Sequence, residues 1–320
     1  METYKIGILE PDNFSPIAIS KLEEIGEVTT YQRDGSKEDI KAFIEDKNAL
    51  FVRLKYQIDQ ELVEGATGLK YICSPTTGLN HISITNSDIK IVSLKGEYGF
   101  LETIRATPEH VFGLTLALLR NYASAFIKSE EQAWNRDVYR GYELYGAKIG
   151  IIGLGRIGRL LVKYFTAFDA KVGYYDILPK NNVSESVVCY HSIEELISNS
   201  EIVILEANYN PENEKMITSD LFHMMEGKYF INAARGELVD EMALLEGIKA
   251  NLFKGVAVDT FANESKEYNL EKEFTKLTEG RNLIITAHIG GATYTSMQRT
   301  EEFIAEKLVK IVNLSVKNII

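Results

Sequence analysis

The sequence predicts an α/β protein that contains two parallel sheets, each covered by helices on both faces. Three observations favour this fold class. Short β-branched or aromatic runs alternate with segments of helical spacing, which is typical of a parallel sheet. The alternation occurs twice, with a new series beginning near Lys148. The chain has 320 residues, which suits two domains of about 150 residues each rather than a single core.

The first series of predicted strands lies in the N-terminal part of the chain. Between the strands, residues 15–26 and 36–47 carry helical spacing. Ser36 is a favourable N-cap residue, because its hydroxyl can accept a hydrogen bond from a free backbone N–H. The predicted strands are KIGILE (5–10), EVTTYQ (27–32), ALFVR (49–53), LKYICS (69–74) and KIVSL (90–94).

The second series consists of nearly continuous apolar runs, as expected for strands that are buried on both faces. Helical segments separate these strands. Ser192 with Glu195 predicts a capping box before one helix, and Thr218 and Ser219 are candidate caps for another. The predicted strands are KIGIIG (148–153), KVGYYD (171–176), EIVILEA (201–207), KYFINAA (228–234), GVAVDT (255–260) and NLIITAH (282–288).

Two long helical stretches set the predicted domain boundaries. Residues 107–128 are predicted as one long helix that opens the second domain, whereas the amphipathic stretch 293–316 has no strand after it. We therefore expect the last helix to return and pack on the first domain. The first predicted domain consists of residues 1–101 plus 289–320, and the second of residues 102–288.

The composition favours a cytoplasmic protein that binds neither nucleic acid nor an anionic membrane surface. The net charge is -11 and the pI is about 5.1, whereas both of those partners need clustered Lys and Arg. The longest apolar stretch, 111–119, is too short to span a bilayer, and the start of the chain lacks the pattern of a signal peptide. Cys73 and Cys189 lie far apart, which suits a reducing compartment. No cluster of residues has metal-ligand spacing, so no metal is expected.

A glycine motif predicts dinucleotide binding. Gly153-x-Gly155-x-x-Gly158 follows an apolar strand and opens a helix, and the next strand ends in Asp176. The first glycine permits a tight turn, the second the approach of a pyrophosphate, and the third close packing of the helix on the strand. Asp176 can bind ribose hydroxyls and would repel a 2′-phosphate, which favours NAD over NADP. The alternatives are a structural glycine-rich turn and an aspartate that merely ends a strand, but the ordered pattern favours a Rossmann domain.

The other strands of the second series deliver polar residues to the same edge of the sheet. The carboxyl ends of parallel strands lie together, and ligands of open α/β sheets bind just beyond them. These strands end at Asn208, Arg235, Asp259 and His288. The sequence therefore predicts one site that combines an arginine, an aspartate and a histidine with a bound dinucleotide.

Two of these side chains, together with a glutamate on a nearby loop, have the chemistry for a 2-hydroxy acid. The fork of Arg235 can hold a carboxylate bidentately, and His288 can take or give a proton near neutral pH. Glu264 is a candidate to orient the histidine ring, and Ala233-Ala234 leave room for a flat ring. A surface salt bridge is the alternative role for Arg235. With a dinucleotide as hydride acceptor, this set describes oxidation of a 2-hydroxy acid to a 2-keto acid.

Four blocks of the sequence resemble the signature blocks of the D-isomer-specific 2-hydroxyacid dehydrogenase family, in the same order. They are GLGRIG (153–158), NAARGELVD (232–240), GVAVDTFANE (255–264) and ITAHIGGAT (285–293). The resemblance implies an NAD-dependent D-2-hydroxyacid dehydrogenase that acts on a small anionic substrate. It also implies a flavodoxin-like substrate domain, built from the start of the chain and its last helix, and a homodimer.

The resemblance implies a role for individual residues. Arg235 would bind the substrate carboxylate and polarise the carbonyl, Glu264 would pair with His288, and His288 would be the general acid/base. The implied substrate contacts are Thr77 and Gly78, in a turn that is similar to the family's substrate-side turn, together with Arg235. The implied cofactor contacts are Gly153, Gly155, Arg156, Ile157, Gly158, Asp176, Ala233, Arg235, Asp259, His288 and Gly291, with Asp259 on the nicotinamide carboxamide.

The chain departs from the family pattern in several places, and two of these departures bear on ligand contacts. After the third strand of the second series, LEANYNPENE places Glu206, Asn208 and Asn213 where other residues are usual, so cofactor contacts on that side differ from the pattern. Segment 93–110 is longer than usual, and it is expected as a loop that sets substrate specificity.

Alternatives stay open for the function and for several residues. Formate and phosphite oxidation are alternatives within the family, but Glu264 favours a hydroxy acid. A non-catalytic NAD-sensing regulator on the same fold is the alternative from another class. Arg53 and Lys55 are candidates either for an anionic substrate tail or for a solvated pair. His81 and His110 are interpreted as packed or capping histidines.

Overall fold

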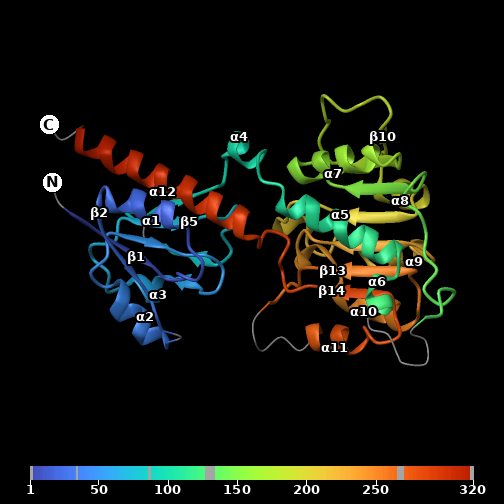
Figure 1. Ribbon diagram of the computed structural model, residues 1–320, viewed down its shortest axis with the longest axis horizontal. Coiled ribbons are helices and arrows are strands. Elements are labelled where there is room, and N and C mark those ends of the chain that lie inside the picture. The colour runs from blue at the N-terminus through green and yellow to red at the C-terminus, as the bar shows by residue number, and fades with distance from the viewer. Residues whose placement is uncertain (1–2, 34, 86–87, 127–133, 265–269, 318–320) are drawn as a thin grey trace. The chain divides into compact units, whose positions relative to one another are not determined.

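A parallel sheet organises each of the two units into which the chain divides (Figure 1). The structure is a computed structural model, and it describes residues 3–33, 35–85, 88–126, 134–264 and 270–317. The first unit consists of Met1–Ile104 and Ala292–Ile320, and the second of Arg105–Gly291. Parallel strands covered by helices in both units confirm the predicted α/β class.

The first unit has a flavodoxin-like sheet. Its strands are β1 (Tyr4–Ile8), β2 (Gly26–Thr30), β3 (Ala49–Phe51), β5 (Tyr71–Ser74) and β7 (Lys90–Ser93). The strand order is β2-β1-β3-β5-β7, and all neighbours are parallel. This order matches the flavodoxin-like arrangement, in which the chain starts inside the sheet and extends it in both directions. The short strands β4 (Ile58–Asp59) and β6 (Ile82–Ser83), which the sequence patterns do not predict, pair separately.

Helices cover both faces of this sheet, because successive residues of a strand point to opposite sides. The helices of the unit are α1 (Pro16–Glu23), α2 (Lys37–Ile44), α3 (Gln60–Val63), α4 (Tyr98–Leu101) and α12 (Tyr294–Lys317). Ala49 and Phe51 of β3 join an apolar cluster with Ile304 of α12. Leu50 joins a second cluster with Ile40 of α2. The last helix of the chain therefore forms part of the core of the first unit.

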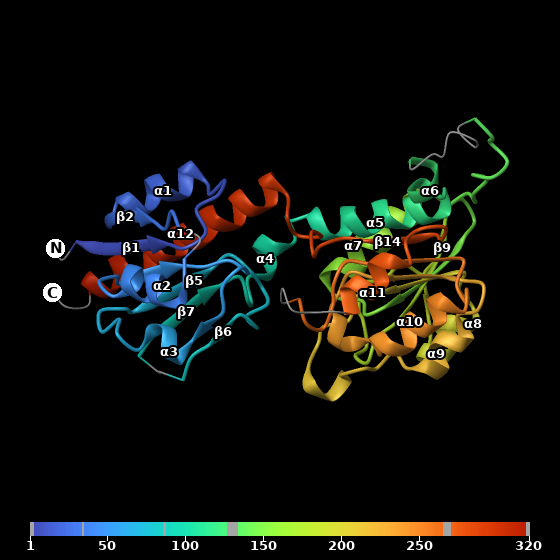
Figure 2. The ribbon, with the colours of Figure 1, turned by 90° about the horizontal axis from the view of Figure 1, so that it is seen from below.

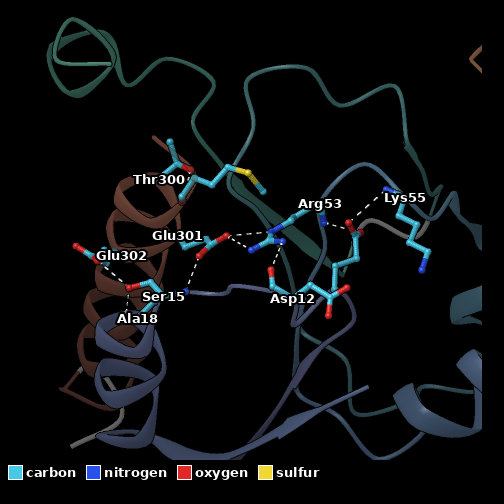
Figure 3. A network of polar contacts seen from close by, with 10 residues as sticks. Asp12, Ser15, Ala18, Arg53, Lys55, Thr300, Glu301 and Glu302 are labelled. Carbon is cyan, nitrogen blue, oxygen red and sulfur yellow. Dashed lines mark hydrogen bonds and ion pairs between the residues drawn. The ribbon is translucent and has the colours of Figure 1, made fainter. Parts of the chain in front are cut away.

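A buried ion pair connects α12 to the strand region of the first unit (Figure 3). Glu301 of α12 is fully buried and accepts hydrogen bonds from the Arg53 guanidinium and, at 2.7 Å, from the Ser15 N–H. Arg53 Nη1 donates to the Asp12 carbonyl oxygen at 2.9 Å. The Arg53 side chain is only 13% exposed, so the prediction of a solvated residue is wrong, and its guanidinium is already engaged within the protein.

The second unit has a seven-stranded parallel sheet within the described residues. Its strands are β8 (Lys148–Ile152), β9 (Lys171–Tyr175), β10 (Val188–Cys189), β11 (Ile202–Leu205), β12 (Tyr229–Asn232), β13 (Gly255–Val258) and β14 (Leu283–Ile285). The order is β10-β9-β8-β11-β12-β13-β14. The direction of winding reverses between β8 and β11, which is the switch point of a Rossmann fold. This order confirms the predicted Rossmann domain.

Helices also cover both faces of the second sheet, and Figure 2 shows α5 above it and α9 and α10 below it. The helices are α5 (Ala106–Leu119), α6 (Tyr122–Phe126), α7 (Arg156–Ala167), α8 (Ile193–Ser198), α9 (Ser219–Met224), α10 (Glu241–Lys249) and α11 (Leu270–Lys276), with the 3-10 helices η2 (Pro211–Asn213) and η3 (Gly236–Leu238). Ile202 and Ile204 of β11 pack with the α5 and α7 side, whereas Val203 and Leu205 pack with the α8, α9 and α10 side. The continuous apolar run therefore reflects burial on both faces.

The helix predicted over residues 107–128 is interrupted. α5 ends at Leu119, Asn121 has a φ of 51°, and α6 begins at Tyr122. Asparagine tolerates this left-handed conformation, so it can end a helix even where an apolar pattern continues. Residues 127 and 128 of the prediction lie outside the described residues.

Segment 93–110 is partly helical, so its prediction as a loop is wrong. α4 lies within it, and α5 begins at Ala106. Leu101 is buried, and the Phe100 ring stacks on Phe303 of α12 with 4.1 Å between ring centroids. This packing against a helix distant in sequence stabilises a helical turn that the local pattern does not predict.

The helix caps follow the sequence predictions in part. Ser36 forms a complete capping box at the start of α2. Ser192 accepts a hydrogen bond from the Glu195 N–H at 3.1 Å, but the Glu195 carboxylate accepts from the His191 N–H instead of that of Ser192. The predicted box is therefore only half formed. Thr218 takes the N-cap position of α9 without a side-chain hydrogen bond.

Three further findings bear on the class of protein. The described residues contain no helix that is long and apolar enough to cross a membrane. Cys73 is buried and Cys189 is exposed, and both are free thiols. Among the side chains that the structure describes, no group of three or more His, Cys, Asp or Glu residues could hold a metal ion.

We predict that Glu301→Ala destabilises the protein by about 3 kcal/mol or more, because it leaves the buried Arg53 guanidinium without its partner. Urea unfolding followed by circular dichroism measures this loss. The matched control is Lys249→Ala, which breaks an exposed pair with Glu246 on α10 and should leave the unfolding midpoint near that of the wild type. If both variants unfold at the wild-type midpoint, the buried pair does not stabilise the fold.

Candidate functional site

The glycine turn after β8 has the geometry that a dinucleotide needs. Gly153 has a φ of 102°, and a Cβ there would lie 2.7 Å from the backbone nitrogen of Ala207. A Cβ at Gly158 would lie 2.4 Å from the carbonyl oxygen of Gly153. At Gly155, by contrast, no heavy atom of the described residues lies within 4 Å of the Cβ position. The fold therefore requires two of the glycines, and the third leaves open space for a phosphate.

The start of α7 presents backbone N–H groups next to this open space. Gly155 is the N-cap residue, and no side chain in the described ranges caps the helix. Arg156 and Ile157, which the sequence places at the pyrophosphate, are its first two residues. The first N–H groups of a helix lack partners within the helix and carry partial positive charge, so this end suits an anion.

Asp176 follows β9, and three donors hold its carboxylate. Its Oδ2 atom accepts from the Leu154 N–H at 2.8 Å and lies 2.9 Å from Lys180 Nζ, and its Oδ1 atom accepts from the Leu178 N–H at 2.9 Å. Burial acts to raise the pKa of Asp176, but these hydrogen bonds outweigh burial and hold the pKa below its ordinary value. The carboxylate is therefore ionised and oriented. Lys180 is a neighbour that the sequence analysis missed.

Asp259, directly after β13, organises the loop that carries the predicted catalytic histidine. Its side chain is 1% exposed. Oδ1 accepts from Thr286 Oγ1 at 2.5 Å and from the Ile289 N–H at 2.9 Å, and Oδ2 accepts from the Gly290 N–H at 2.9 Å. Burial acts to raise the pKa of Asp259, and the donors more than offset it and lower the pKa. The contact of Asp259 with a nicotinamide carboxamide stays a prediction.

His110 of α5 lies against the same aspartate. Its Nε2 atom is 3.3 Å from Thr286 Oγ1 and 3.4 Å from Asp259 Oδ1. These contacts agree with the interpretation of His110 as a packed histidine. The sequence analysis did not show what it packs on, because α5 and the β14 loop are distant along the chain.

The structure brings His288 and Glu264 together. His288 Nδ1 lies 2.7 Å from Glu264 Oε2, and Glu264 Oε1 accepts from the Phe261 N–H at 3.2 Å. The His288 backbone has a φ of 51°, which few residues other than glycine adopt, and its N–H donates to the Asp259 carbonyl oxygen at 2.8 Å. Since Nδ1 meets Glu264, Nε2 is the ring nitrogen left for a substrate.

Arg235 lies at the same edge, in the turn after β12. It is half-buried, its Nη1 atom donates to the Ala234 carbonyl oxygen at 2.6 Å, and the described residues give it no ion pair. A Cβ at Gly236 would lie 2.0 Å from the backbone nitrogen of Ala262, so the chain can turn there only with glycine. The turn therefore places a charged side chain where the buried strand stops. Ala233 and Ala234 beside it are buried.

Glu206 is a buried acid at the switch point, and the sequence analysis noted it only as a departure from a pattern. It is the first residue after β11, and it is 8% exposed. Burial raises the pKa of Glu206 to about 8, and the charge of Asp259 adds to this, whereas Arg156 and Arg235 act against it. A buried acid could not be inferred from the sequence, because its neighbours come from three other strand ends.

The predicted substrate contacts Thr77 and Gly78 lie in the first unit, in the turn after β5. Thr76 Oγ1 donates to the Gly78 carbonyl oxygen at 2.8 Å, and Ser74 Oγ lies 2.8 Å from Thr76 Oγ1 and 3.1 Å from His81 Nε2. These bonds define the shape of the turn, and His81 is buried within it as a packed histidine. The substrate contacts themselves stay predictions.

One edge of the seven-stranded sheet thus gathers most of the predicted site. The residues present fit a dinucleotide: the glycine turn is open at Gly155, and Asp176 is ionised. The predicted site residues at this edge are Gly153, Gly155, Arg156, Ile157 and Gly158 after β8, Asp176 after β9, Ala233 and Arg235 after β12, Asp259 and Glu264 after β13, and His288 and Gly291 after β14.

The chain is similar to known proteins over most of its length. The family model described as D-isomer specific 2-hydroxyacid dehydrogenase, NAD binding domain, matches residues 112–290. A glyoxylate reductase of Thermofilum pendens is 32% identical over 304 residues, which cover 92% of this chain and 87% of that protein. A glyoxylate reductase of Pyrococcus furiosus is 30% identical over 302 residues, covering 91% and 88%.

A solved structure has the same fold. The D-lactate dehydrogenase of Aquifex aeolicus, crystallised with NAD and lactic acid, superposes with a TM-score of 0.79 at 24% identity, covering 98% of this chain and 96% of that chain. The family model accounts for more than half of the sequence, and the two reductases align with nearly all of it. The chain therefore belongs to the D-isomer specific 2-hydroxyacid dehydrogenase family.

Proposed function

We propose that this protein interconverts a small 2-keto acid and the corresponding D-2-hydroxy acid, with the catalytic roles on Arg235, His288 and Glu264. Family membership makes the protein an NAD-dependent 2-hydroxyacid dehydrogenase, and the proposal adds the residues and the substrate class. The observation that carries it is the 2.7 Å contact between His288 and Glu264, at the sheet edge that also holds the glycine turn and Arg235.

His288 acts as the general acid/base in this proposal. When the keto acid is reduced, protonated Nε2 gives its proton to the carbonyl oxygen, and in the reverse direction it takes the hydroxyl proton. The cofactor, when bound, would supply the hydride for C2 as NADH and accept it as NAD, so one hydride and one proton are exchanged in each turnover. Glu264 fixes the orientation of the ring through its contact with Nδ1.

Arg235 binds the substrate carboxylate. Its guanidinium is permanently charged, and its planar fork matches a carboxylate with two parallel hydrogen bonds. The contact of Nη1 with the Ala234 carbonyl oxygen restrains the side chain at the strand end. A guanidinium in this position also polarises the carbonyl as negative charge develops on its oxygen.

The cofactor contacts follow the arrangement of the sheet edge. The turn at Gly155 and the first N–H groups of α7 would hold the pyrophosphate, and Asp176 would bind the adenosine ribose. The nicotinamide side is formed by the loops after β12, β13 and β14, where Ala233, Asp259 and Gly291 stand.

The substrate class rests on the relatives and on the charge of the site. Two relatives are named glyoxylate reductase, and the similar solved structure contains lactic acid. Both names refer to short monocarboxylic acids, which one arginine can bind. Loss of NADH fluorescence on addition of glyoxylate, pyruvate and longer 2-keto acids tests the proposal. NADH binding without turnover of any keto acid would instead support a non-catalytic NAD sensor.

We further propose that the first unit is the substrate domain and the second the NAD domain, and that the protein is a cytoplasmic homodimer. The family resemblance supports the domain roles and the dimer, and the free thiols of Cys73 and Cys189 suit a reducing compartment. Light scattering coupled to size-exclusion chromatography measures the oligomeric state directly.

Arg235→Lys should lower kcat/KM for the best keto acid by about 10²-fold or more, because lysine keeps the charge but loses the planar fork. The Tm and the affinity for NADH should change little, since within the described residues the side chain makes one hydrogen bond, to the Ala234 carbonyl oxygen. Arg120→Lys at the exposed end of α5 is the matched control, and it should leave kcat/KM, the Tm and the affinity for NADH unchanged. Near-wild-type turnover by Arg235→Lys, or its unfolding, contradicts the assignment.

His288→Gln should lower kcat by about 10²- to 10⁴-fold in both directions, because the variant cannot transfer a proton. Glu264→Gln should lower kcat less, since the histidine remains but loses its charged partner. Stopped-flow measurement of hydride transfer, at saturating NADH for reduction and at saturating NAD for oxidation, gives these rates. His191→Gln, a change at an exposed histidine, should have no effect. Equal rates for His288→Gln and the wild type would remove His288 from the mechanism.

Asp176→Ala should narrow the preference for NADH over NADPH. The variant loses the carboxylate that repels a 2′-phosphate. Lys180 Nζ, which lies 2.9 Å from that carboxylate in the wild type, remains and attracts the phosphate. Fluorescence titration with both cofactors gives the two Kd values. Lys180→Met should have the opposite effect and strengthen discrimination against NADPH. A wild-type protein that binds NADPH as tightly as NADH would show that Asp176 does not select the cofactor.

A further inference from the structure

Glu206 lies at the switch point of the second sheet. It follows β11 directly, and its N–H donates to the carbonyl oxygen of Ile152, the last residue of β8, at 2.8 Å. A Cβ at Gly153 would lie 2.7 Å from the Glu206 carbonyl carbon. The backbone of Glu206 therefore abuts the glycine turn, at the place where sheets of this topology bind their ligand.

The Glu206 carboxyl group has an unusual environment. It is buried, yet its Oε1 atom has no hydrogen-bond partner among the described residues. Buried polar atoms are nearly always paired, so an unpaired one calls for a partner from outside the described residues, such as a water, an ion or a ligand. The buried carboxylate of Asp259, after β13, differs in this respect, because donors within the protein use both of its oxygens.

The charged groups around Glu206 come from three strand ends. Arg156 stands at the start of α7, Arg235 after β12 and Asp259 after β13. No ion pair joins Glu206 to either arginine in the part of the chain that the structure describes, so the acid is not neutralised by direct contact. Burial, with a smaller contribution from Asp259, raises the pKa of Glu206 to about 8 against the pull of the two arginines. At neutral pH the group is therefore a carboxylic acid, whose O–H can donate.

We propose that Glu206 binds NAD as a neutral acid, by donating a hydrogen bond from its carboxyl group to a phosphate oxygen of the dinucleotide. The inference rests on the proposed NAD site at the glycine turn. A neutral Glu206 adds no negative charge beside Arg156 and Arg235. An ionised Glu206 repels the pyrophosphate and offers it no proton.

If Glu206 binds the cofactor as an acid, NADH binding is linked to proton uptake. NADH prefers the protonated protein, so binding above the pKa of Glu206, about 8, takes up a proton, and the apparent Kd rises by up to about tenfold per pH unit. Glu206→Gln keeps a neutral donor of the same shape, so its Kd should not depend on this ionisation. Glu206→Met removes the donor, and it should weaken NADH binding at pH 7 by about tenfold or more.

Isothermal titration calorimetry of NADH binding between pH 7 and 9, in two buffers with different ionisation enthalpies, measures both Kd and proton uptake. We expect uptake of about half a proton per NADH near pH 8 in the wild type and none from this site in Glu206→Gln. Glu212→Gln is the matched control: it removes an exposed carboxylate in η2, on the same loop, and should behave as the wild type.

Thermal unfolding without NADH provides a readout that is independent of the cofactor. The unfolded chain loses the Glu206 proton near its ordinary pKa of 4.5, whereas the folded chain keeps it up to about 8. Folding of the wild type therefore becomes less favourable as pH rises through this window, and the loss is complete above 8. The Tm of Glu206→Gln should exceed that of the wild type by more at pH 9 than at pH 5.

Two results separate the inference from the proposed function. If the wild type binds NADH but Glu206→Gln shows the same proton uptake and the same pH dependence of Kd, Glu206 does not bind the cofactor as an acid. If the wild type does not bind NADH at any pH, the NAD site itself is wrong, and this inference fails with it.

Discussion

The buried carboxylate of Asp259 is the interaction on which the candidate site depends. Its two oxygens hold Thr286, Ile289 and Gly290, and its backbone carbonyl accepts from the His288 N–H. This set of bonds compensates for the positive φ of His288, a conformation that costs an isolated residue about 1–3 kcal/mol. Once the backbone is held there, the ring meets Glu264, which the loop after the same strand supplies. One buried acid therefore positions the proposed acid/base pair.

The charged groups at the carboxyl edge of the second sheet are arranged in a way that suits anionic ligands. Both proposed ligands, a dinucleotide and a keto acid, are anionic, and two arginines stand at strand ends to meet them. The acids nearby are kept from neutralising these arginines in different ways. Asp259 is saturated by hydrogen bonds, Asp176 is paired with Lys180, and burial keeps Glu206 protonated. An acidic protein with a net charge of -11 can in this way keep a site that attracts anions.

Much of the fold and part of the site could be predicted from the sequence, since both are encoded locally. Apolar runs with glycine turns predict strands and their ends, and parallel strands necessarily bring their carboxyl ends to one edge. The missed features depend on contacts between distant segments. Arg53 pairs with Glu301, 248 residues away, and the helical turn α4 depends on packing against α12. The helix break at Asn121 was missed for a different, local reason. One residue in the left-handed conformation ends the helix although the apolar pattern continues beyond it.

We propose that this sheet edge holds NADH so that its hydride is added to C2 of a 2-keto acid while His288 supplies the proton. The most direct test uses NADH that carries deuterium at the transferred position, with pyruvate as the keto acid. Analysis of the product by mass spectrometry and on a chiral column shows where the label goes. We expect D-lactate that carries one deuterium atom, bound to C2. Product of the L configuration, deuterium that is lost to water, or NADH that stays unconsumed with pyruvate and with every other 2-keto acid tried would contradict it.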